Sequence, residues 1–266
     1  EEVNFKASMP LDASQAKPVD DPQILDRLYE NVRDKVVVID LAKQGISQND
    51  IFIPRNVNGM YSLTGWEDSW AEANGLYLNG KEQPLSRWPN DRHYARWTSS
   101  IGQQTFTYSE STPSRWANAK DFWVGGFPQY DYSYVRMSVK EIDTAKKTIT
   151  VIDNPVVPFS SYMTRRWAAF NLLEEIDVPG EYYIDRDSMK LYYYPPHELD
   201  GQALEVSLLS RAMFDIRKAS DIMFKNLNFS QSRSNAIFME NVDNIDFIEC
   251  SFKDIDVNGI FCRGTQ

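Results

Sequence analysis

Three segments near the C-terminal end of the sequence repeat one pattern: Met213-Phe214-Asp215-Ile216-Arg217, Ala236-Ile237-Phe238-Met239-Glu240 and Gly259-Ile260-Phe261-Cys262-Arg263. Each segment begins 23 residues after the one before it. The segment that follows repeats with the same spacing, because Ile222, Phe224, Leu227 and Phe229 recur as Ile245, Phe247, Cys250 and Phe252. A fixed period of this length, built from short strands, is typical of a solenoid in which each turn stacks on the last.

Alternation within each strand predicts which side chains face the core of this solenoid. The inward residues are predicted to be Phe214, Ile216, Ile237, Met239, Ile260 and Cys262, and Cys250 is also placed in the core. Asp215, Phe238 and Phe261 are predicted to face outward. The outward column Arg217, Glu240, Arg263 supports this register, because strands about 4.8 Å apart bring opposite charges together.

These patterns predict a mainly β chain that contains about three turns of a right-handed parallel β-helix, beginning near Leu204. A leucine-rich repeat is the competing solenoid, but the sequence lacks its leucine lattice. We divide the chain into a leading strand segment at 1–20, which could belong to an earlier turn, an inserted antiparallel β-rich domain at 21–200 and the parallel turns at 201–266.

The inserted domain is predicted to be β-rich with one short helix. Residues 20–34 suit a helix capped by Asp21, with Pro22 at its first position. The segments 35–41, 135–142 and 148–152 alternate as strands do, and Asn79-Gly80 predicts a tight hairpin between 75–78 and 81–85.

Composition excludes several classes of function. The formal charge of −10 argues against a nucleic-acid partner, and no apolar run reaches the roughly 18 residues needed for a membrane span. Two cysteines are too few for a disulfide framework or a zinc site, so we expect no metal. We also expect no cofactor, since no phosphate-binding loop or dinucleotide motif occurs.

Several separate segments resemble one family. They are residues 76–80 followed by Ser86-Arg87-Trp88-Pro89-Asn90, the run from Asn171 to Asp185, and Leu191-Tyr192-Tyr193-Tyr194-Pro195-Pro196. Together with the repeats, they resemble the bacterial parallel β-helix proteins related to glycoside hydrolase family 141. The resemblance implies a secreted or periplasmic protein that acts on glycans or polysaccharides and has a β-rich domain inserted between early turns. It also implies that this chain is a fragment, with catalytic carboxylates in later turns beyond Gln266 and with those turns as its partner.

Candidate site residues fall into two groups. Asp254 and Asp256, two residues apart before the last repeated strand, are the candidate catalytic carboxylates, although the sequence favours turn-forming aspartates that cap their own backbone at these positions. Arg87, Trp88, His93, Arg96 and Trp97 have the composition of a sugar-binding surface, but the tryptophans also suit a core.

Two other clusters have structural and functional interpretations. Phe238 and Phe261 are predicted either to form an aromatic platform for a glycan or to be covered by the inserted domain. The acidic residues Glu174, Glu175, Asp177 and Glu181 lie near Arg165-Arg166 in the sequence, which favours a salt-bridged corner between domains over a catalytic pair.

The leading functional hypothesis is therefore part of a glycoside hydrolase-like protein that is inactive on its own. The alternatives are a noncatalytic carbohydrate-binding or adhesin module and a polysaccharide lyase. A lyase would need clustered outward carboxylates for Ca²⁺, whereas the outward columns here are mixed.

Overall fold

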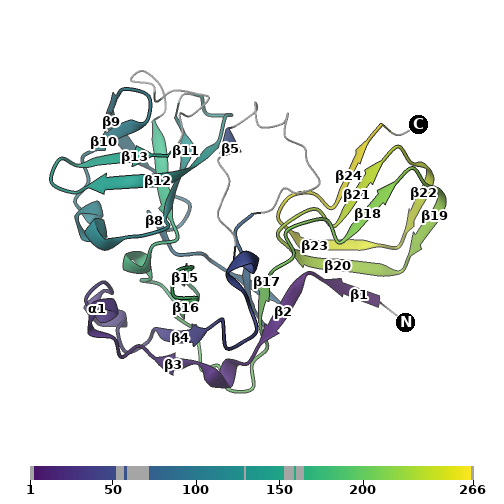
Figure 1. Cartoon of the computed structure of the whole chain (residues 1–266), viewed down its shortest axis with the longest axis horizontal. Helices are drawn as coiled ribbons and strands as arrows, with labels where there is room; N and C mark the ends of the chain where they lie inside the picture. Colours follow the sequence, from purple (N-terminus) through teal and green to yellow (C-terminus); the bar gives the residue numbers. More distant parts are fainter. Residues whose placement is uncertain are drawn as a thin grey trace.

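The computed structural model describes residues 3–51, 57–58, 72–128, 130–152, 159 and 165–264. This part of the chain is mainly β, as predicted. Figure 1 shows parallel strands at one end, a barrel at the other and two small antiparallel sheets between them. Among the described residues, no helix is long and apolar enough to cross a membrane.

The C-terminal strands form parallel ladders. Their members are β18 (Phe214–Arg217), β21 (Ile237–Glu240) and β24 (Ile260–Arg263) in one ladder; β19 (Ser220–Lys225) and β22 (Asp243–Ile248) in a second; and β1 (Val3–Lys6), β20 (Leu227–Ser232) and β23 (Ser251–Ile255) in a third.

The predicted 23-residue register is confirmed. Phe214 pairs with Ile237, which pairs with Ile260, and Phe224 pairs with Phe247. Identical side chains therefore stack, and the rings of Phe224 and Phe247 lie 5.0 Å apart. Glu240 accepts from Arg217 at 3.2 Å and from Arg263 at 2.8 Å, as predicted for the outward column. Exposed pairs of this kind stabilise by about 1 kcal/mol at most, so the apolar stacks carry the ladder.

The first described strand of the chain, β1, is part of one of the ladders. β1 pairs with β20 in parallel, with Val3 opposite Leu227, and Phe5 stacks on Phe229 at 5.5 Å. In contrast, β17 (Leu204–Ser207) pairs antiparallel with β2 (Ser8–Leu11), so the parallel pairing begins at Phe214 rather than near Leu204.

The burial predicted for three inward side chains of the ladders is corrected. Cys262 and Ile260 are exposed and Cys250 is only partly buried, because β22, β23 and β24 each have a parallel neighbour on one side only among the described strands. Phe238, predicted to face outward, is covered by its neighbours. Phe238 has 0% exposure. Its ring stacks on Phe261 at 5.5 Å and lies beside the guanidinium of Arg217 at 5.0 Å, so it has no free face for a glycan.

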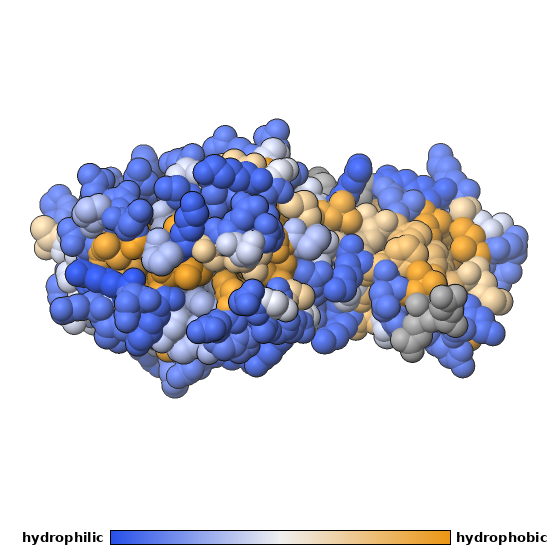
Figure 2. All heavy atoms as spheres, turned by 90° about the horizontal axis from the view of Figure 1, so that it is seen from below, coloured by the Kyte–Doolittle hydropathy of each residue, from blue (hydrophilic) through white to orange (hydrophobic). Residues whose placement is uncertain are grey.

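Figure 2, which views the molecule from below, shows apolar side chains gathered on the surface of the ladder end, whereas polar residues cover most of the opposite end around a narrower apolar band. Exposed apolar residues of the ladders include Val3, Met223, Ile248 and Ile260. Patches of this kind on a folded protein mark surfaces that contact other chain segments or partners.

Six strands of the inserted region close into a barrel in the order β11 (Trp123–Phe127), β12 (Val135–Asp143), β13 (Thr148–Val151), β10 (Thr105–Tyr108), β9 (Ala95–Ile101) and β14 (Arg166–Phe170). The strands predicted at 135–142 and 148–152 are thereby confirmed.

β14 closes the ring by pairing with both β9 and β11. Gly126 permits this closure, because a Cβ at that position would collide with the backbone of Arg166. β8 (Arg87–Trp88) and β5 (Val57–Asn58) pair at the barrel margin.

Two four-stranded sheets connect the barrel and the ladders. One contains β15 (Tyr182–Asp185), β16 (Lys190–Tyr193), β4 (Val37–Asp40) and β3 (Lys17–Pro18); the other contains β2, β17, β6 (Leu76–Leu78) and β7 (Lys81–Gln83). The predicted hairpin is confirmed, since Asn79 and Gly80 join β6 to β7 with positive φ angles of 52° and 72°. The strand predicted at 35–41 is β4.

The predicted helix at 20–34 is shorter than expected. Asp21 caps it by accepting from the Gln23 amide at 2.9 Å, but α1 spans only Pro22–Leu25. Tyr29 then adopts extended backbone angles, and a 3-10 turn follows at Glu30–Val32. Leu28 and Val32 nevertheless reach the same apolar cluster, each from its own turn. The other 3-10 turns within the described residues are Ala13–Gln15, Gln48–Asp50, Thr112–Asn118 and Leu173–Glu175.

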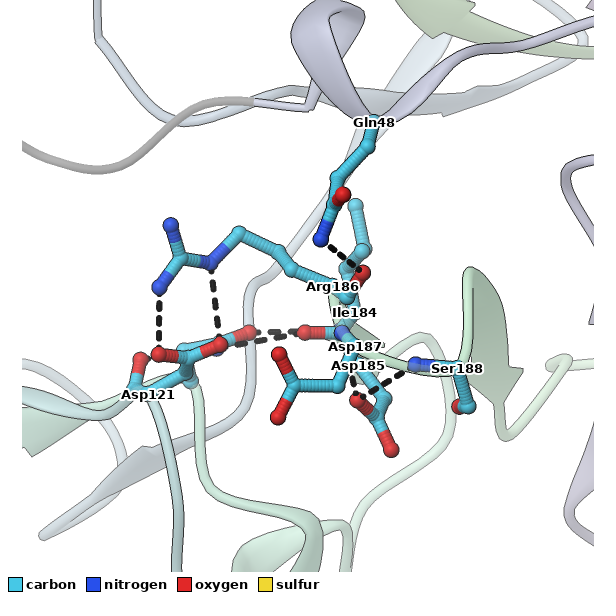
Figure 3. Close-up of polar contacts among 8 residues, drawn as sticks. Gln48, Asp121, Ile184, Asp185, Arg186, Asp187 and Ser188 are labelled. Atoms are coloured by element: carbon cyan, nitrogen blue, oxygen red, sulfur yellow. Dashed lines mark hydrogen bonds and ion pairs between the residues drawn. The ribbon is translucent and has the colours of Figure 1, made fainter.

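A polar joint fixes the barrel to the first of these sheets (Figure 3). The guanidinium of Arg186, just after β15, binds both carboxylate oxygens of Asp121, which lies just before β11. Asn171 donates to the carbonyl of Asp121 at 3.1 Å and accepts from the amide of Ile184 at 3.2 Å. Because this geometry is bidentate, it sets orientation as well as contact.

The stacked aromatic rings should be the main source of stability of the parallel ladders. Phe229 has 0% exposure between Phe5 and Phe252, so Phe229→Ala should lower the free energy of unfolding by about 3–5 kcal/mol. Urea denaturation followed by circular dichroism measures this loss. Met223→Ala, in the exposed face of β19, should change stability by less than about 0.5 kcal/mol, and equal losses in the two variants would contradict this account.

Candidate functional site

A cleft of about 520 Å³ lies where the barrel, the β6–β7 hairpin and the parallel ladders meet. We call it the junction cleft. It is lined by residues of all three parts: Glu72, Ala73, Gly75, Glu82, Gln83, Pro84, Leu85, Trp123, Tyr134, Arg136, Phe170, Tyr182 and Asp256. The volume lies within the range that small-molecule sites have in proteins.

Aromatic side chains supply much of the wall. Trp123 at the start of β11 and Phe170 at the end of β14 are paired strand neighbours, and their rings stack at 6.4 Å with an interplanar angle of 15°. Tyr182 is held by its hydroxyl, which donates to the carbonyl of Asn74 at 2.7 Å. Flat rings held rigidly in this way suit the C–H faces of sugars.

Asp256 brings a carboxyl group into the cleft from the ladders. Its amide donates to the carbonyl of Ser232 at 2.9 Å, so it occupies in its turn the place that Arg233 occupies one turn earlier. The loss of water around the carboxyl, together with the negative charges of Glu82, Glu72 and Asp254, raises the pKa of Asp256 to about 7.

Glu82 provides a second carboxyl from strand β7. Its pKa is also raised, mainly by burial and then by the charge of Asp254. Asp256 and Glu82 therefore hold protons more readily than ordinary carboxyl groups, which is the property that general acid catalysis exploits.

Arg136 is the basic residue among the described lining of the cleft. Its side chain comes from β12, is part of a residue with only 8% exposure, and donates from Nη1 to the carboxylate of Glu72. Its Nε and Nη2 atoms are buried without an acceptor among the described residues. Donors of this kind inside a cleft are available to a ligand.

The two predicted catalytic residues have different environments. Asp256 lines the cleft, whereas Asp254 has a positive φ of 54° and lies 3.7 Å from the ammonium of Lys253. Gln231, one turn earlier, has nearly the same φ, which indicates that Asp254 occupies a recurrent turn position. The partner of Asp256 in the cleft is Glu82, which sequence reasoning missed because it lies far away in the chain.

The residues predicted to bind a sugar do not form one surface, because some lie inside the barrel and others outside it. Trp97 has 2% exposure, and Trp88 packs at 5.4 Å from Trp167, so both tryptophans belong to the barrel core. His93 and Arg96 are exposed. The guanidinium of Arg87 lies 5.1 Å from the ring centroid of Phe170, so Arg87 packs against a residue that lines the cleft.

The predicted acidic corner is buried, but its cations differ from those expected. Glu174 accepts from Arg27 at 2.7 Å, while Glu175 accepts from the Trp116 indole at 2.7 Å and lies 3.8 Å from Arg115. Arg166 instead pairs with Asp131, because alternation along β14 turns Trp167 into the core and Arg166 outward.

Burial dominates the protonation of this corner. It raises the pKa of Glu175 to about 8. It also raises the pKa of Glu181 to about 8, although that carboxylate accepts from the amides of Asp177 and Val178. Within the described ranges, no group of three or more His, Cys, Asp or Glu residues is arranged to hold a metal ion.

Comparison with known proteins places the fold. No family model matches the chain, and no curated protein matches it. A solved structure described as a "Glycoside hydrolase" matches all of this chain and 52% of its own, with a TM-score of 0.65 and 15% sequence identity. The chain therefore has a glycoside hydrolase-like fold and spans about half the length of that structure.

The buried acidic corner predicts a stability that falls as pH rises. The folded pKa of Glu181, about 8, lies above the ordinary value of 4.5, so its contribution is complete below about pH 4.5 and is lost as pH rises through 8. Glu181→Gln keeps an oxygen acceptor for the two amides and removes the titration. Between pH 5 and pH 8, the stability of this variant should fall by about 3 kcal/mol less than that of the original protein.

Thermal unfolding at a series of pH values measures this difference. Glu141→Gln, at an exposed position of β12, serves as the control and should leave the pH dependence unchanged. Parallel profiles for Glu181→Gln and the original protein would show that Glu181 does not titrate in this range.

Proposed function

We propose that this chain is part of a carbohydrate-active, glycoside hydrolase-like protein and that the junction cleft receives a glycan. The observation that carries the proposal is the meeting of stacked aromatic rings, raised-pKa carboxyl groups and buried Arg136 donors in one cleft. Rings pack against sugar C–H faces, while carboxylates and guanidinium groups exchange hydrogen bonds with hydroxyls. The fold similarity supports the same class of function.

We further propose that the ladders are turns of a right-handed parallel β-helix, with the barrel and small sheets inserted between two turns, as in proteins related to glycoside hydrolase family 141. The constant 23-residue register and the pairing of β1 with β20 across the insertion support this architecture. Further turns of the parent protein are the proposed partner of the apolar ladder end. A secreted or periplasmic bacterial location is proposed with the family.

Hydrolysis of a glycosidic bond needs two carboxyl groups on opposite sides of the scissile bond. We propose that the catalytic pair of the parent protein lies in later turns, and that Asp256 and Glu82 bind sugar hydroxyls next to it. The 266-residue chain then binds glycans without cleaving them.

Loss of an aromatic wall should weaken glycan binding. Phe170→Ala removes the ring that stacks on Trp123, so the dissociation constant for a bound oligosaccharide should rise about tenfold or more. Titration calorimetry against a panel of oligosaccharides measures this change. Tyr132→Ala, which removes an exposed ring outside the cleft lining, should leave affinity within about twofold. A tenfold loss in His93→Ala with no loss in Phe170→Ala would place binding at the 87–97 segment instead.

The chain alone should release no reducing sugar from oligosaccharides that it binds. A sensitive reducing-end assay, run at several pH values between about 5 and 8, tests this expectation. Turnover that disappears in Asp256→Asn would overturn the placement of the catalytic pair in later turns and assign catalysis to the junction cleft.

A further inference from the structure

We infer that the junction cleft selects glycans without acidic groups and rejects uronic acid-containing chains, an inference that rests on the proposed glycan-binding function. The structural basis is a charge imbalance. Carboxyl groups enter the cleft from three separate elements, namely the segment before β6, strand β7 and the turn after β23. The positive charge among the described residues of the cleft is the guanidinium of Arg136, from β12.

The positive charge of Arg136 is already matched. Its Nη1 atom donates to Glu72, whose own backbone is tied to the buried Arg233 through an amide and a carbonyl hydrogen bond. Because Glu72 is fixed in this way, an acidic sugar would have to displace a positioned carboxylate to pair with Arg136. Replacing one anion by another gains little, and it separates the partly buried carboxylate of Glu72 from Arg136.

The other two carboxyl groups, those of Glu82 and Asp256, have no counter-ion among the described residues that line the cleft. Neither Glu82 nor Asp256 forms an ion pair with any described residue. Arg233 acts on Asp256, but its guanidinium is committed to the carbonyls of Leu208, Glu72 and Asp50. Burial raises the pKa of both carboxyl groups, and nearby negative charges raise it further, that of Asp254 for Glu82 and that of Glu82 for Asp256.

These charges treat a neutral sugar and a uronic acid differently. A neutral sugar offers hydroxyl donors to Glu82 and Asp256 and oxygen acceptors to the buried Nε and Nη2 atoms of Arg136. A uronic acid brings a carboxylate close to two carboxyl groups that form no ion pair with the described residues. Like charges juxtaposed in this way are a common basis of specificity against a competing ligand.

Matched sugars test the inference directly. The 266-residue chain is titrated calorimetrically with neutral oligosaccharides of several backbones, with the uronic acids of the same length and linkage, and with the methyl esters of those uronic acids. β-1,4-Linked mannose and mannuronic acid oligomers form one such set. At about 50 mM salt and about pH 8, the neutral sugar and the ester should bind at least tenfold more tightly than the acid.

A double variant tests whether the carboxyl groups of the cleft cause the preference for neutral sugars. Glu82→Gln combined with Asp256→Asn should narrow the ratio of neutral to acidic affinity by about fivefold or more, because both unmatched charges are removed. Glu141→Gln removes one exposed charge on the barrel and should leave the ratio unchanged. The methyl ester keeps the inference testable if the double variant does not fold, because it removes the charge from the ligand instead.

The outcomes separate the inference from the function on which it rests. Equal or tighter binding of the uronic acid would overturn the charge selection while leaving glycan binding in place. An ester that binds as weakly as the acid would also overturn it, since size rather than charge would then be the cause. Absence of binding to every sugar in the panel would overturn the proposed function and the inference together.

Discussion

A single buried guanidinium holds together the segments that meet at the junction cleft. Arg233 has 1% exposure and donates to the carbonyls of Leu208, Glu72 and Asp50, which belong to three separate stretches of chain. Burial lowers its pKa to about 10, so it stays protonated at neutral pH. Buried carbonyls without donors are costly, and Arg233 supplies donors to all three, sharing the carbonyl of Asp50 with the side-chain amide of Asn74. The cleft depends on it further, because it holds the backbone of Glu72, the partner of Arg136.

The ladders were predictable from sequence because their order is carried by a repeat. When each turn has the same length, the position of one inward phenylalanine predicts the next, and Phe224 and Phe247 stack as expected. The position of Cys262 was not predictable by the same reasoning. Alternation gives the direction of a side chain, whereas burial also requires a neighbouring strand to cover it.

The candidate site was predictable only in part, because its residues come together through tertiary structure. Asp256 was a sequence candidate, but Glu82 and Arg136 reach it from a hairpin and a barrel strand that no local pattern connects to the ladders. Composition likewise could not separate sugar-binding tryptophans from core tryptophans. Trp97 and Trp88 turned out to be core residues, since closure of the barrel demands large side chains in its interior.

The pairing of β1 with β20 has a consequence for how the chain folds as it is synthesised. Asn4 and Asn228 share a hydrogen bond across 224 residues, so β1 cannot pair with β20 until the whole insertion has left the ribosome. During that interval the barrel, whose contacts are more local, is free to form first. The insertion therefore separates the synthesis of β1 from that of β20 in time. Phe5 cannot stack on Phe229 until the insertion has been synthesised.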